Sequence, residues 1–191
     1  PGGLPGFTLV GLPETAVREA RDRVKCAIQN CGLEFPQGRV VVNLAPADLV
    51  KEGARYDLAI AVSILCATGQ LPQRAAARFE YLGELGLFGE LRTVRGALCA
   101  ALALHDEPAN PRRLVIPAPN ADEARLCPGA RMLAVRHLSE LVDLLRHGTP
   151  PAAATSDGLL ADTAHMPGIS PPPDDPAHII GQESAKRALT L

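Results

Sequence analysis

The 191-residue sequence predicts a mixed α/β domain, because short β-branched segments alternate with segments whose apolar residues recur every three or four positions. Hydrophobic residues make up 47% of the chain and charged residues 21%, which is typical of a globular protein with a sizeable core. Aromatic residues make up only 3% and tryptophan is absent, so the core is expected to be aliphatic.

The first two elements are a short strand and a long helix. FTLV, at residues 7–10, lies among glycines and prolines and predicts a strand. Pro13 suits the first position of a helix, and Gly32 suits its end. The helix face predicted to be buried comprises Val17, Ala20, Val24, Ala27, Ile28 and Cys31. The opposite face is either simply solvated or a basic reading surface, and it carries Glu14, Arg18, Arg21, Asp22 and Lys25.

The next two elements are predicted to lie in the core. Residues 39–44, RVVVNL, are β-branched and apolar, so we expect a buried strand. Residues 57–68 are apolar on nearly all sides, which indicates a central, buried helix closed by Gly69. Asp57 stands at its N-terminus, where the helix dipole favours a carboxylate.

The second half repeats the alternation of strands and helices. Residues 80–93 predict two strands joined by a tight hairpin near Gly89. The remaining predicted elements are a helix at 95–106, a strand at 112–117, a short helix capped by Asn120, a strand at 132–135, and a helix at 138–146 with Leu141, Leu144 and Leu145 inward.

The composition divides the chain into three parts. Residues 1–147 hold all the elements above and form the predicted domain. Residues 148–176 are rich in proline and aspartate and lack Lys and Arg, so we expect a flexible linker. Residues 177–191, AHIIGQESAKRALTL, indicate the start of another, truncated module.

Motifs for catalysis are missing from the sequence. No GxxxxGK[ST] phosphate loop and no GxSxG nucleophile elbow occurs. Glu84 and Glu90 flank the predicted hairpin, where surface charges are commoner than a paired acid site. The five cysteines share no ligand spacing with the five histidines, so we expect free thiols and no metal site.

One segment stands out for binding. Residues 48–57, DLVKEGARYD, concentrate charge directly before the predicted buried helix, where free backbone N–H groups can bind an anion. The alternative is a charged capping loop. The net charge of −2 and pI of about 6.2 exclude a whole-domain basic footprint for nucleic acid but leave room for a local patch.

Membrane partners are not expected. No apolar run approaches the roughly 18 residues that span a bilayer, and no signal peptide is visible. We therefore expect a cytoplasmic protein.

Several long strings resemble the N-terminal region of the ComM/YifB family of magnesium-chelatase-like AAA+ ATPases. They are GLPGFTLVGLPETAVREARDRVKCAIQNCG (3–32), FPQGRVVVNLAPADLVKEGARYDLAIAVSIL (35–65), YLGELGLFGELRTVRGAL (81–98) and LVIPAPNADEA (114–124). IIGQESAKRAL (179–189) is similar to the opening of the family's ATPase module. The resemblance covers nearly the whole chain outside the linker.

The resemblance implies a Lon-protease-like domain of the ribosomal-S5-domain-2-like fold, a mixed sheet backed by helices, without its expected first strand. Lon peptidases use a serine just after a loop that corresponds here to residues 51–54, and a lysine on a later helix. Those positions hold Arg55 and, approximately, Leu98. A hydroxyl nucleophile needs a neighbouring base, so this domain is expected to be non-catalytic.

For the complete protein, the resemblance implies a hexameric, ATP-driven motor for branch migration of DNA during recombination and natural transformation. ATP and Mg²⁺ are expected in the full-length protein, and no cofactor is expected in the 191-residue chain itself. Ile179, Ile180 and Gly181 match the segment that lies against the adenine in AAA+ proteins. By analogy with RadA, the residues expected to contact DNA or a neighbouring subunit are Lys51, Arg55, Arg18 and Arg21.

Three other functions are alternatives for this chain. A purely structural oligomerisation domain is not separable from a DNA-contacting one by sequence. An active Lon-type peptidase is disfavoured by Arg55. A true magnesium-chelatase subunit is disfavoured because its ATPase subunit lacks this Lon-like front domain.

Overall fold

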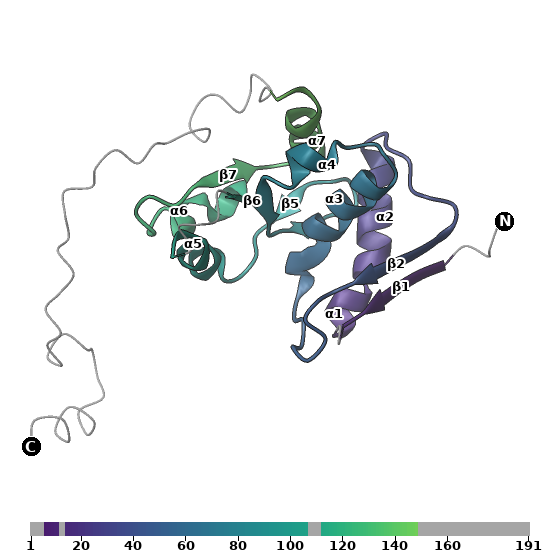
Figure 1. Ribbon diagram of the computed structural model, residues 1–191, viewed down its shortest axis with the longest axis horizontal. Coiled ribbons are helices and arrows are strands. Elements are labelled where there is room, and N and C mark those ends of the chain that lie inside the picture. The colour runs from purple at the N-terminus through teal and green to yellow at the C-terminus, as the bar shows by residue number, and fades with distance from the viewer. Residues whose placement is uncertain (1–5, 12–13, 107–111, 149–191) are drawn as a thin grey trace, which may run out of the picture.

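A computed structural model describes residues 6–11, 14–106 and 112–148 (Figure 1). The predicted α/β class is confirmed. In chain order the elements are β1 (Gly6–Val10), α1 (Thr15–Arg18), α2 (Ala20–Asn30), β2 (Arg39–Asn43), the 3₁₀ turn η1 (Ala54–Tyr56), α3 (Asp57–Ala67), α4 (Gln73–Ala76), β3 (Phe79–Tyr81), β4 (Glu84–Leu85), β5 (Leu91–Arg92), α5 (Ala97–His105), β6 (Arg113–Pro117), the 3₁₀ turn η2 (Ala118–Asn120), α6 (Ala121–Ala124), β7 (Met132–Val135) and α7 (Leu138–His147).

The described strands form three small sheets rather than one continuous sheet. β1 and β2 are parallel, and β3, β6 and β7 form a parallel sheet with β6 in the centre. β4 and β5 form a short antiparallel hairpin. Figure 1 shows α1, α2, β1 and β2 at one end of the molecule and α5 and α6 beside β6 and β7 at the other.

The predicted first helix forms as two segments separated at Glu19. Its predicted inner face is confirmed, since five of its six residues are buried and Cys31 is half-buried. Gly32 follows the helix end with a φ of 72°, a left-handed conformation in which glycine meets no steric penalty. The predicted start at Pro13 lies outside the described residues.

The prediction of a buried strand at residues 39–44 was wrong in its burial. β2 alternates between exposed and half-buried positions, and Val41 is 55% exposed. Val40 and Val42 pack against the core from the other face. Among the described residues β2 pairs only with β1, and the exposed Val41 side chain shows that one face of β2 is open to solvent.

The predicted central helix is confirmed as α3. Its apolar residues form much of the larger core, together with residues of α2 and α7. Ser63 and Ala67 are exposed, so one narrow strip of the helix faces outward. A smaller second core joins α5 and α6 to the opposite face of β6, centred on Leu114 and Ile116.

The hairpin predicted at residues 80–93 is shorter than expected. Its first part, β3, joins the parallel sheet with β6, and only β4 and β5 pair as a hairpin. The turn is at Gly89, which has a φ of 97°. A Cβ at Gly89 would lie 2.6 Å from Cys31 Sγ and 2.9 Å from His137 Cε1, so the turn packs tightly against both side chains.

Asn120 precedes α6 as predicted, but its side chain does not cap that helix. The side chain is buried, accepts from the backbone N–H of Val94 and donates to the Val94 carbonyl. It therefore fixes the segment before α5 against the end of β6. In α7, Leu141 and Leu145 are buried as predicted, and Leu144 is half-buried.

In the described ranges, no helix combines the length and apolar character that a membrane span requires. The predicted linker at 148–176 and the predicted module at 177–191 lie, beyond Gly148, outside the described residues.

Candidate functional site

The charged segment before α3 folds inward at Lys51. Lys51 is only 3% exposed, and its ammonium group donates to the carbonyls of Pro46 and of Leu49, the latter at 2.7 Å. An ammonium group held by carbonyls of its own loop is not presented to a phosphate. This geometry therefore favours a structural role for Lys51, while its predicted contact with DNA or a subunit stays a prediction.

The segment then turns into α3 through Gly53. Gly53 has a φ of 70° and a ψ of 175°, a backbone conformation that is nearly restricted to glycine. The turn η1 follows and ends at Tyr56, directly before Asp57. The segment predicted to bind an anion is thus a tight turn before α3, and the side chain of its lysine, Lys51, is buried.

A buried ion pair anchors the start of α3. Arg23 Nε donates to Asp57 Oδ2 at 2.6 Å, and Arg23 Nη2 donates to Asp57 Oδ1 at 3.1 Å. The Asp57 side chain is 1% exposed and that of Arg23 is 17% exposed. Two parallel bonds of this kind fix the relative orientation of the two groups, so the pair locks α2 against α3.

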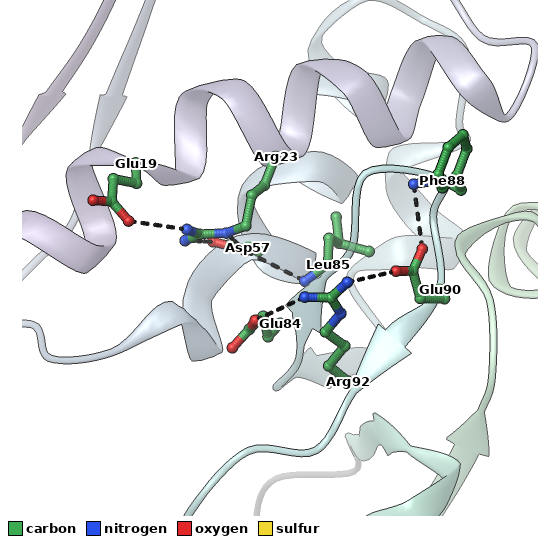
Figure 2. A network of polar contacts seen from close by, with 8 residues as sticks. All are labelled: Glu19, Arg23, Asp57, Glu84, Leu85, Phe88, Glu90 and Arg92. Carbon is green, nitrogen blue, oxygen red and sulfur yellow. Dashed lines mark hydrogen bonds and ion pairs between the residues drawn. The ribbon is translucent and has the colours of Figure 1, made fainter.

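The same carboxylate reaches the hairpin. The backbone N–H of Leu85 donates to Asp57 Oδ2 at 3.3 Å, and Glu19 lies 3.6 Å from Arg23 on the outer side (Figure 2). Asp57 therefore ties α2, α3 and β4 together. The hydrogen bond that Arg23 donates to Asp57 raises the pKa of Arg23. Burial raises the pKa of Asp57, and the neighbouring Arg23 cation acts in the opposite direction.

Glu84 and Glu90 do not form a paired acid site. Both lie beside Arg92 of the hairpin, whose nitrogens are 3.9 Å from Glu84 and 2.9 Å from Glu90 (Figure 2). Glu90 also accepts from the N–H of Phe88. The pKa of Glu90 is lowered, mainly because its carboxylate accepts a hydrogen bond from its own backbone N–H. The neighbouring Arg92 and the N–H of Phe88 lower it further. These contacts make the two carboxylates hairpin surface charges, which was the commoner alternative.

Arg55, at the position expected for a Lon-type serine, extends its side chain to the turn before α5, the helix that carries Leu98. Arg55, at the serine position, is half-buried, and its Nη1 lies 3.7 Å from where a Cβ would stand on Gly96. Gly96 precedes α5, and Leu98 lies in the first turn of that helix. The two positions that would hold a nucleophile and a base in a Lon-type peptidase therefore hold a guanidinium group and an aliphatic side chain.

The other predicted contact residues lie elsewhere. Arg21 is exposed on α2, one turn before the exposed Lys25. Arg18 is the last residue of α1, and its side chain lies outside the described part of the chain. Ile179, Ile180 and Gly181 also lie outside it. α1, which carries Arg18, packs against η1, which carries Arg55, and contact of these residues with DNA or a subunit stays a prediction.

Sequence reasoning did not select Arg23, which is the central partner of the buried pair. A signal was present, because Arg23 lies three residues after Ala20 and four before Ala27, both on the predicted inner face. A cation on one buried helix and an anion, Asp57, at the start of another predict a pair. Among the described residues, no group of three or more His, Cys, Asp or Glu side chains is placed to hold a metal ion.

Comparisons with known proteins identify the class. Residues 1–120 match the family described as subunit ChlI of Mg-chelatase. The chain is 42% identical over 189 residues to competence protein ComM of Haemophilus influenzae, covering 99% of this chain and 36% of that protein. It is 41% identical over 194 residues to the uncharacterized protein YifB of Escherichia coli, covering 99% and 35%.

A mycobacterial relative extends the comparison. An uncharacterized protein of Mycobacterium bovis is 40% identical over 191 residues, which cover 99% of this chain and 36% of the relative. The chain thus spans about a third of the length of these relatives. The α/β fold and the family match define the class as Mg-chelatase-like, within the AAA+ ATPase-like proteins. The chain belongs to the ComM/YifB family of that class.

Proposed function

We propose that this chain is the non-catalytic N-terminal domain of an AAA+ ATP-dependent DNA motor, in which it serves subunit assembly and DNA contact. Family membership supports the motor, and the name of the ComM relative, a competence protein, supports a role in DNA uptake and recombination. In this proposal the complete protein forms a hexameric ring that drives branch migration.

The observation that supports a non-catalytic domain is the pair Arg55 and Leu98 at the Lon-type positions. Arg55 has no hydroxyl to attack a peptide bond, and Leu98 has no amine to accept a proton. The N–H of Leu98 instead donates to Glu123 Oε1 at 3.2 Å, which joins α5 to α6. A Ser–Lys mechanism needs both groups at once, so the proposal assigns this location to packing.

ATP and Mg²⁺ belong, in this proposal, to the ATPase module. The chain contains no phosphate-binding loop of the GxxxxGK[ST] type, so its described residues offer no cradle for a triphosphate. The contribution of this domain to the motor is then mechanical. It holds neighbouring subunits together and guides the DNA strand.

A purely structural assembly domain is the second candidate. Leu49 and Val50, consecutive in the connection between β2 and η1, are 60% and 49% exposed. Exposed neighbouring aliphatic residues favour contact with another protein surface. This candidate differs from the first only in lacking DNA contact.

Fluorescence anisotropy with the 191-residue chain separates the two candidates. Labelled single-stranded, duplex and four-way-junction DNA are titrated at several salt concentrations. Binding whose logarithm falls linearly with the logarithm of salt concentration is expected, because phosphate contacts release counterions. Absence of binding to all three DNAs at low salt would overturn the DNA contact and favour the assembly domain.

A further inference from the structure

Three arginines lie side by side at the end of the β3-β6-β7 sheet where the three parallel strands begin. Arg78 directly precedes β3, Arg113 opens β6, and Arg131 directly precedes β7. The N–H of Arg113 donates to the Arg78 carbonyl at 3.1 Å, and the N–H of Leu114 donates to the Arg131 carbonyl at 2.8 Å. These bonds place the three backbones side by side, about 5 Å from one strand to the next.

The row concentrates positive charge on a chain whose net charge is −2. Arg78, Arg113 and Arg131 are all exposed. Neither Arg78 nor Arg113 makes an ion pair with a carboxylate in the described part of the chain. The nearest acidic group along the strands, Glu80, pairs with Arg112. The guanidinium groups of Arg78 and Arg113 therefore keep their full charge toward solvent.

A hollow of about 200 Å³ lies beside this row. Arg78 and Arg113 line it together with Phe79, and the side chains of Leu133 and Leu144 supply apolar walls. Phe79 is half-buried, so part of its ring is available for contact. Cationic groups beside an apolar hollow with an aromatic ring are the elements by which proteins hold an unpaired nucleotide, with charge on the phosphate and stacking on the base.

We infer that Arg78 and Arg113 bind consecutive phosphates of single-stranded DNA, with one unstacked base in the hollow lined by Phe79 and Leu133. This inference rests on the proposed DNA contact and specifies its surface. The surface is distinct from the residues expected from the family resemblance, which lie on α1, α2 and the segment before α3. Arg131 is the third arginine of the row and does not line the hollow. It adds to the positive potential along the path of the bound DNA strand.

The test is anisotropy of the 191-residue chain with labelled oligothymidine and a duplex of equal length across a salt series. The variant Arg78→Ala/Arg113→Ala is expected to bind oligothymidine at least tenfold more weakly. Its salt slope is expected to fall by about 1.4, because each single-strand phosphate contact contributes about 0.7. Arg78→Lys/Arg113→Lys keeps the two charges and is expected to retain most of the affinity.

Two further pairs serve as comparisons. Arg39→Ala/Arg136→Ala removes the same charge from exposed positions at the start of β2 and just after β7. It is expected to change affinity by no more than about twofold, because distant exposed charges are screened. Arg21→Ala/Arg55→Ala removes contact residues expected from the family resemblance and is expected to have a smaller effect than Arg78→Ala/Arg113→Ala. Thermal unfolding of every variant verifies that the fold is retained.

The outcomes separate this inference from the proposed function. Equal binding by the unmodified chain and by a folded Arg78→Ala/Arg113→Ala variant would overturn the inference alone. A dominant loss in Arg21→Ala/Arg55→Ala, or tighter binding of the duplex, would do the same. If the unmodified chain bound no DNA at all, the inference and the DNA contact would both fail, while assembly would remain measurable by light scattering.

Discussion

At the residue scale, Asp57 is the one acidic residue that is buried in the described part of the chain. It accepts from two nitrogens of Arg23 and from the N–H of Leu85, so one side chain joins two helices and a hairpin strand. A buried pair of this kind gains little over an apolar pair, yet removing one partner leaves an uncompensated charge. Its contribution is therefore best described as fixing how α2, α3 and β4 meet.

The first prediction concerns this pair. Asp57→Asn should destabilise the domain by about 3 kcal/mol or more, because the half-buried Arg23 would lose the carboxylate that it bonds inside the protein. Urea unfolding measures the change. Asp122→Asn, at a side chain that is 92% exposed, removes a surface partner of Arg125 and should have little effect. Equal losses in the two variants would contradict the role assigned to Asp57.

Arg23→Met in combination with Asp57→Asn should recover part of the stability lost in Asp57→Asn, since the half-buried cation that has lost Asp57 is then removed as well. Urea unfolding of Arg23→Met, Asp57→Asn and the double variant gives the coupling free energy of the pair. Additive losses would indicate that the two groups act independently, against the bidentate geometry.

A second prediction concerns Gly89. Gly89→Ala should destabilise the domain by about 2 kcal/mol, because the new Cβ would overlap Cys31 Sγ and the His137 ring. Gly32→Ala is the matched control, because Gly32 also has a positive φ but no atom lies within 4 Å of its Cβ position. Thermal unfolding should therefore show a larger fall for Gly89→Ala, and the reverse order would contradict the close packing of the hairpin turn.

At the scale of elements, β2 shows how a β-branched run can be only half-buried. Its alternation puts Val40 and Val42 on the core and Val41 on the open face. A run of three valines predicts a strand correctly, because β-branched side chains suit an extended backbone. The run cannot reveal how many faces are covered, because that depends on which strands and helices pack around it.

The third prediction follows from this one-sided burial. Val42→Ala should destabilise the domain by about 1 kcal/mol through loss of buried apolar area, whereas Val41→Ala should change stability by less than about 0.5 kcal/mol. Chemical denaturation of the two single variants is the measurement. Equal and large losses would show that the open face of β2 is covered in solution.

At the scale of the whole molecule, the described residues form two cores on opposite faces of the β3-β6-β7 sheet. The larger one joins this sheet to α2, α3 and α7, and the smaller one joins it to α5 and α6. Both cores are aliphatic, in keeping with the low aromatic content. Arg78, Arg113 and Arg131 lie at the end of this sheet where its three strands begin. The sheet that separates the two cores therefore also holds the row of three positive charges.

The fourth prediction addresses assembly. If the exposed pair Leu49 and Val50 contacts a neighbouring subunit, the 191-residue chain should show a concentration-dependent mass above that of the monomer. Leu49→Asp/Val50→Asp should shift that mass toward the monomer without lowering the unfolding temperature, because charges disfavour an apolar contact. Size-exclusion chromatography with light scattering measures the mass of both proteins, and thermal unfolding measures the unfolding temperature. An unchanged mass distribution in the variant would place the assembly surface elsewhere.

The sequence by itself determined the α/β class, the order of the longer elements, the inner faces of α2 and α7, and the family, but not the short helix α4. These properties follow from local periodicity and from matching strings, which are readable along one chain. It also showed which chemical groups are missing at positions 55 and 98, because residue identity alone decides whether a nucleophile or base is present.

Only the tertiary structure decided which side chains meet. Lys51 and Asp57 are both charged and close in sequence, yet one bonds to carbonyls of its own loop and the other to Arg23, 34 residues away. The row of Arg78, Arg113 and Arg131 likewise exists only because three parallel strands begin at one sheet edge. Such contacts depend on strand pairing and helix packing between distant segments, and local sequence patterns do not encode these directly.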